Sequence, residues 1–190
     1  MAYDARAVSN LILDEAGRSR ITHVALQKLL YFSHGLHLQR TGEPLVKGYF
    51  EAWQHGPVHP AVYQAFKAAG AQPIVFRAQA RDPLTGEERA LEPDIDDLAF
   101  HCVRRTVASY ADLNPWALVA ISHAKGAPWD IVVEQAKDGV AFGLRISDDL
   151  IRVGFGKHKV SIRDIQDKGD LHEEAPIDLS NRSGTHSTTG

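Results

Sequence analysis

Residues 21–70 read ITHVALQKLLYFSHGLHLQRTGEPLVKGYFEAWQHGPVHPAVYQAFKAAG, and this stretch decides the fold. Thr22 can accept a hydrogen bond from a free amide of a first helical turn. The predicted helix ends where Gly42 can adopt a left-handed conformation and where Pro44 prevents the helix from continuing. Apolar residues between these ends cover nearly every side of the helical wheel. Because such a helix belongs in the middle of a domain, the other elements are expected to pack around residues 23–40.

A short strand and a rigid turn follow the central helix. Residues 49–53 are rich in aromatic side chains, which favours a strand. The next residues, 55–60, predict a rigid turn in which Gly56 supplies an unusual backbone dihedral angle and Pro60 occupies the first position of a new helix. That helix is expected to end at Gly70.

The remaining pattern is mostly helical. Amphipathic spacing and capping residues predict helices over residues 4–16, from Asp94, from Pro115 to near Gly126, over 128–139 and after Ser147. Residues 71–93 predict a loose hairpin or a mobile loop, and the strand-like residues 142–146 can pair with residues 50–53. The predicted fold class is therefore mainly α, a compact bundle of about six helices around a central buried helix, with a small antiparallel β-sheet.

Length and composition limit the domain count and the partners. The 190 residues suit one domain over residues 1–165, followed by a polar C-terminal tail over residues 166–190 that is expected to be disordered. The single cysteine, Cys102, lies at a core-facing position, and the N-terminus has no signal-peptide pattern, so we expect a cytoplasmic protein. With 21 basic and 24 acidic residues the net charge is -3, which gives no field that attracts nucleic acid or an anionic membrane.

Sequence signatures of catalysis and cofactor binding are missing. The chain has no Walker A loop, no GxGxxG, no HExxH and no paired cysteines with zinc spacing. We therefore expect no cofactor and no enzymatic activity.

Two strings in the opening stretch resemble a known family. LQKLLYFSHGLHLQRTGEPL (residues 26–45) and FEAWQHGPVHPAVYQAFKAAG (residues 50–70) are similar to the Panacea antitoxin domain, also called SocA-like and related to the phage protein GepA. Helix, strand and glycine-proline turn agree with that family in order and spacing. The resemblance covers about residues 8–155 and includes Ser122-His123 and Pro128-Trp129.

The resemblance implies a bacterial or phage antitoxin. Members of the family neutralise a cognate toxin encoded beside them by binding it directly, and the domain is paired with many unrelated toxins. In the SocA-type member the toxin is a SocB-like inhibitor of the replication sliding clamp, and the antitoxin is an adaptor that presents it to the ClpXP protease. The implied partner is therefore a protein, with no role for a membrane or for nucleic acid.

An antitoxin of this kind needs exposed aromatic and polar side chains around which a protein interface can form. The expected contact residues come from the central helix, the turn, the helix after it and the second half of the chain: Tyr31, His34, Trp53, His55, Tyr63, His123 and Trp129. Convergence of these residues on one concave patch would support the interface hypothesis, whereas enclosure of all the tryptophans would remove them as anchors.

Three alternatives compete with protein binding. A metal- or histidine-dependent enzyme would bring His34, His37 and His59 together as ligands. A hydrolase would pair His123 or His34 with a serine, but Ser122 and His123 are adjacent on a helix and point about 100° apart. A DNA-binding autoregulator would need a basic helix, which the chain lacks.

Overall fold

The computed structural model describes residues 1–17, 21–137 and 144–158 of the chain. Seven α-helices occur in this described part: α1 (Ala5–Glu15), α2 (His23–Thr41), α3 (Pro60–Phe66), α4 (Asp97–Tyr110), α5 (Pro115–Ser122), α6 (Pro128–Lys137) and α7 (Asp148–Gly154). The strands are short: β1 (Phe50–Trp53), β2 (Gly56–Val58), β3 (Gln79–Arg81), β4 (Glu88–Ala90) and β5 (Arg145–Ile146). Single 3₁₀ turns follow α3 (η1, Lys67–Ala69) and α7 (η2, Phe155–Lys157). The predicted class, mainly α with a small antiparallel sheet, is confirmed.

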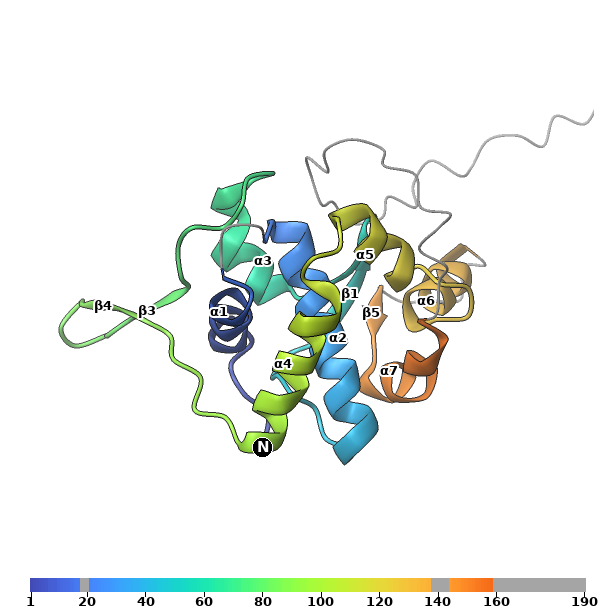
Figure 1. Cartoon of the computed structure of the whole chain (residues 1–190), viewed down its shortest axis with the longest axis horizontal. Coiled ribbons are helices and arrows are strands. Elements are labelled where there is room, and N and C mark those ends of the chain that lie inside the picture. Colours follow the sequence, from blue (N-terminus) through green and yellow to red (C-terminus); the bar gives the residue numbers. More distant parts are fainter. Residues whose placement is uncertain (18–20, 138–143, 159–190) are drawn as a thin grey trace, which may run out of the picture.

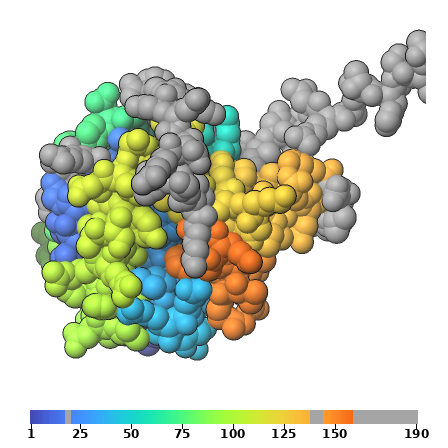
Figure 2. All heavy atoms as spheres, turned by 45° about the vertical axis from the view of Figure 1, so that its right-hand side comes forward, coloured from blue at the N-terminus to red at the C-terminus, as the bar shows by residue number. Residues whose placement is uncertain are grey.

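Helix α2 is the central element, as its apolar pattern predicts. The Thr22 hydroxyl accepts a hydrogen bond from the Ala25 amide, and Gly42 ends the helix with a φ of 75°. Helices α1, α4, α5 and α7 all pack against α2 (Figure 1). The space-filling view shows the C-terminal end of α2, in light blue, reaching the surface between α4 and α7 (Figure 2).

A three-stranded antiparallel sheet lies beside α2, with β1 between β2 and β5. Phe50 pairs with Ile146, so the predicted pairing of the two segments is confirmed for the described residues, while positions 142 and 143 lie outside them. The segment after His55 differs from the prediction. It forms strand β2, because the chain reverses tightly enough to place Gly56 opposite Trp53.

Two predicted helix boundaries are wrong by a few residues. Helix α4 begins at Asp97 rather than near Asp94, because Asp96 is the capping residue and its carboxylate accepts the Ala99 amide at 2.8 Å. Helix α5 ends at Ser122, before the turn that leads into α6. The predicted end of α6 at Gly139 lies outside the described residues.

The predicted domain division stays a prediction, because residues 159–190 lie outside the described part. Within the described ranges, every helix is too short or too polar to cross a membrane.

Candidate functional site

The hairpin formed by β1 and β2 is held on the central helix by two buried polar side chains. Gln27 accepts a hydrogen bond from the His59 amide at 2.8 Å through its side-chain oxygen. The ammonium group of the next residue, Lys28, donates to the carbonyl oxygen of Pro57 at 3.1 Å. Both side chains have no exposed surface. The backbone of the hairpin is therefore fixed to α2 by hydrogen bonds that are shielded from water, where a hydrogen bond is electrostatically stronger.

Gly56 lets this lysine lie directly under the turn. Its φ is 106°, which only glycine adopts readily, so the predicted need for a glycine dihedral is confirmed. A Cβ atom at this position would lie 2.4 Å from the Ser122 hydroxyl oxygen and 2.8 Å from Cε of Lys28. The Ser122 hydroxyl in turn donates to the Val119 carbonyl at 2.8 Å. Helices α2 and α5 therefore meet beneath the glycine.

Aromatic side chains lie around the turn, and four of them are connected to one another by ring contacts and a hydrogen bond. Trp53 contacts Tyr63 with their ring centres 4.8 Å apart, and the Trp129 indole nitrogen donates to the Trp53 carbonyl at 2.8 Å. The His123 ring stacks on Trp129 with a centroid separation of 3.6 Å and an interplanar angle of 8°. His55, at the hairpin turn, meets Trp116 of α5 edge to face. We call Trp53, His55, Tyr63, His123 and Trp129 the turn cluster.

The turn cluster is partly open to solvent. Trp53 is 8% exposed, and the other four members are half-buried. Burial lowers the pKa of His123 to about 3, and the nearby Lys28 charge lowers it further in the same direction. Its ring nitrogen Nε2 is buried without a hydrogen-bond partner. His123 is therefore neutral at pH 7, and the cluster presents aromatic rings rather than a positive imidazolium.

Two of the seven expected contact residues lie elsewhere, and the expectation of exposure is wrong for both of them and for Trp53, which is buried at 8% exposure. Tyr31 has no exposed surface and His34 has 1%. Tyr31 packs edge to face on Phe50, because helix α2 is covered on the side that carries it. His34 donates from Nε2 to Asp148 of α7 at 3.0 Å and accepts the Val46 amide at Nδ1.

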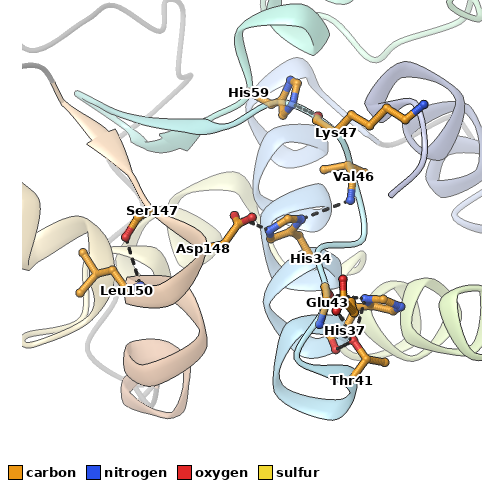
Figure 3. A network of polar contacts seen from close by, with 10 residues as sticks. All are labelled: His34, His37, Thr41, Glu43, Val46, Lys47, His59, Ser147, Asp148 and Leu150. Atoms are coloured by element: carbon orange, nitrogen blue, oxygen red, sulfur yellow. Dashed lines mark hydrogen bonds and ion pairs between the residues drawn. The ribbon is translucent and has the colours of Figure 1, made fainter. Parts of the chain in front are cut away.

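The three histidines of the metal hypothesis also have separate structural partners (Figure 3). His37 donates to the Glu43 carbonyl at 2.8 Å, beyond the end of α2, and His59 donates to the Lys47 carbonyl at 2.9 Å. Burial lowers the pKa of His59. Across residues 1–17, 21–137 and 144–158, no three His, Cys, Asp or Glu side chains are arranged to share a metal ion. The condition for the metal hypothesis, convergence of His34, His37 and His59, is not met.

A surface pocket of about 480 Å³ lies between the start of α1 and helix α3. It is lined by Asp4, Ala5, Arg6, Lys47, Gly48, His59, Ala61 and Gln64. Its arginine is already bound to Asp4 through a 2.8 Å ion pair, which lowers the pKa of that carboxyl group. None of the expected contact residues lines this pocket.

Gln27 and Lys28, the polar residues that hold the hairpin on α2, were not among the predicted site residues, and Ser122 was named only as a possible nucleophile. A signal for two of them exists. Gln27 and Lys28 are polar residues in a helix whose apolar residues lie on all sides. Because every side of this helix is packed against other elements, both side chains are buried. A polar side chain in that position needs a backbone partner.

The fold and the turn cluster together define a class: a mainly helical domain with a small sheet, which displays a half-buried aromatic cluster held by buried polar side chains. The chain belongs to the family described as antitoxin SocA-like, Panacea domain, whose model matches residues 26–130. It is 43% identical over 175 residues to Antitoxin SocA of Caulobacter vibrioides (strain NA1000 / CB15N), which covers 91% of this chain and 93% of that protein. None of the solved structures gives a significant match. The predicted family is confirmed.

Proposed function

We propose that this chain is a cytoplasmic antitoxin that neutralises a cognate toxin by binding it directly, without catalysing a reaction. The observation that carries the proposal is the similarity to Antitoxin SocA, which extends over 91% of the chain. Similarity over that length includes the central helix and the complete β1–β2 hairpin. The proposal thus applies to the whole described domain and not to an isolated motif.

The turn cluster is the proposed contact surface. Four of the seven expected residues, Trp53, Tyr63, His123 and Trp129, are joined there by ring contacts and one hydrogen bond, although each comes from a different part of the sequence, and His55 contacts Trp116 of α5. Tryptophan and tyrosine are enriched among the residues that dominate binding energy in protein interfaces. Trp53 is buried, and Tyr63 and Trp129 are half-buried, so their rings are held in place before binding, which lowers the entropic cost of binding. Tyr31 and His34 are left out of the proposed contact because they are buried.

Co-expression tests the proposal directly. The neighbouring reading frame is induced in a host alone and then together with this chain. Growth arrest with the neighbour alone, relieved by this chain and accompanied by co-purification of the two polypeptides, is the expected result. A neighbour that is harmless alone, or rescue without a physical complex, contradicts direct neutralisation.

Variants in the hairpin turn and on α3 beside it should weaken binding without unfolding the domain. Gln54 is exposed between two members of the turn cluster, so Gln54→Glu adds a charge at the proposed contact without altering the core. We expect this variant and Tyr63→Ala to bind the toxin at least about tenfold more weakly, measured by calorimetry. Arg105→Ala, at an exposed position on α4, is the matched control and should bind as the unmodified chain does. Equal affinity for all four proteins would remove the turn cluster from the interface.

Neutralisation could proceed by delivery of the toxin to a protease or by sequestration of the toxin. If the chain acts as a SocA-type adaptor for a SocB-like toxin, the toxin should disappear faster when the antitoxin is present, and only in cells with active ClpXP. Simple sequestration leaves the toxin at least as long-lived as it is alone. A pulse-chase measurement of toxin half-life with and without the protease separates the two.

A further inference from the structure

Strands β3 and β4 form an arm that projects from the α1 side of the domain (Figure 1). We define the arm as residues 77–92. Its strands pair antiparallel, with Gln79 opposite Ala90 and Arg81 opposite Glu88. The side chains of both strands are exposed or half-buried, so they add little to the core. A two-stranded hairpin is marginally stable on its own in water, so this one requires other support.

The support at the base is a fully buried asparagine of α1. The Asn10 amide nitrogen donates to the carbonyl oxygens of Ala78 and Leu91, at 2.9 and 2.8 Å, and its oxygen accepts the Ala78 amide at 2.8 Å. Arg77 adds ion pairs to Asp14 and Glu92, each at 3.0 Å. One side chain thus joins both strands to the helix, which fixes the direction in which the arm leaves the domain.

The tip of the arm is ordered by its own hydrogen bonds. The Asp82 carboxylate accepts the amides of Leu84 and Thr85, at 2.8 and 3.0 Å. The Asp82 backbone bonds to Gly86 and Glu87 across the turn. Leu84, held on the outside of this turn, is 94% exposed. A hydrogen-bonded base and a hydrogen-bonded tip therefore present one large apolar side chain to solvent.

We propose that the arm is a binding element that inserts Leu84 into an apolar pocket on the cognate toxin. The inference rests on the proposed function and names a second contact, separate from the turn cluster. A preorganised turn loses little freedom on binding, so burial of the leucine contributes almost fully to affinity.

The charge and the size of the arm distinguish a protein toxin from other possible partners. Strands and tip carry two arginines and three carboxylates, which disfavours the phosphates of nucleic acid and an anionic membrane. A specific protein interface buries at least about 1,000 Å², more than a six-residue tip can provide, so the tip alone cannot hold two copies of the chain together. The tip is therefore one part of a larger protein interface, as expected for a toxin that also contacts the body of the domain.

The test uses the full chain and the product of the neighbouring reading frame, made by cell-free translation. Two variants remove the contact: Leu84→Asp, and a shortened arm in which residues 82–87 are replaced by Asn-Gly, a two-residue hairpin turn. Val153→Asp is the matched control, because Val153 is also an exposed apolar residue, at 76%, but lies on α7. We expect both arm variants to bind at least about tenfold more weakly with unchanged thermal stability, and Val153→Asp to bind normally.

The outcomes separate this inference from the proposed function. Normal binding by both arm variants overturns the inference and leaves the proposed function standing. Absence of binding by the unmodified chain overturns both. Equal weakening by Val153→Asp overturns the inference as well, because the effect would then be unspecific. A concentration-dependent dimer of the unmodified chain that Leu84→Asp abolishes would identify a second copy as the occupant and also overturn it.

Discussion

Gly56→Ala is expected to lower the free energy of unfolding by about 4 kcal/mol, from backbone strain plus overpacking. The backbone strain arises because φ at this position is 106°, outside the regions that residues with a Cβ adopt readily. Overpacking arises because the new methyl group would lie 2.4 Å from the buried Ser122 hydroxyl oxygen. Ser122 cannot turn away without losing its hydrogen bond to Val119. We expect urea unfolding to show the loss as a lower midpoint.

Gly42→Ala is the matched control for this substitution. Gly42 also has a positive φ, 75°, but a Cβ atom there would meet nothing within 4 Å. Only the dihedral penalty applies, so the expected loss is about 1 kcal/mol. The difference between the two variants measures the crowding beneath the turn. Equal losses would mean that the contact with Lys28 and Ser122 relaxes at no cost.

Acidification is expected to destabilise the domain through two histidines, the buried His23 and the half-buried His123. Burial lowers the pKa of His23 to about 4 and that of His123 to about 3. The unfolded chain binds a proton at each below about pH 6.5, whereas the native state stays neutral. The unfolded state therefore binds more protons, and the free energy of unfolding falls as the pH falls through this window. At pH 5 each histidine accounts for a loss of about 2 kcal/mol, relative to pH 7.5.

His123→Phe isolates one of the two contributions. Phenylalanine keeps an aromatic ring to stack on Trp129, and the buried Nε2 atom that it removes has no hydrogen-bond partner to lose. The variant should match the unmodified chain at pH 7.5 and lose about 2 kcal/mol less between pH 7.5 and 5. Urea unfolding at the two pH values gives both numbers. An unchanged pH dependence would show that folding does not lower the pKa of His123.

Local rules predicted elements well where one short stretch contains the whole signal. Thr22 and Gly42 mark the ends of α2 because capping depends on hydrogen bonds within one turn of the helix. Boundaries were less accurate where several residues of the same type compete. Near α4 both Asp94 and Asp96 can cap, and the structure uses the second, whose carboxylate also bonds to the Tyr3 hydroxyl from a distant part of the chain.

Burial around the central helix could not be assigned residue by residue. A helix that is apolar on every side has no polar face that would mark its solvent-exposed side. The sequence around Tyr31 and His34 therefore does not show that both are buried, while most members of the turn cluster are half-buried. Asp148, which bonds to His34, lies 114 positions away. Such a contact depends on where α7 packs, and no periodicity within α2 describes that.

By itself the sequence determined the central helix, the positive φ at Gly56, the order of strand and helix, and the resemblance to an antitoxin family, since these depend on residues close together along the chain. Only the tertiary structure decided that Lys28 and Ser122 meet under the turn, that Trp53 and Trp129 share a hydrogen bond, and that Asn10 anchors a projecting arm. The physical reason is the distance along the chain over which each interaction acts. Capping and dihedral preferences act within about one helical turn, whereas these contacts join segments that become neighbours only when the chain packs around α2.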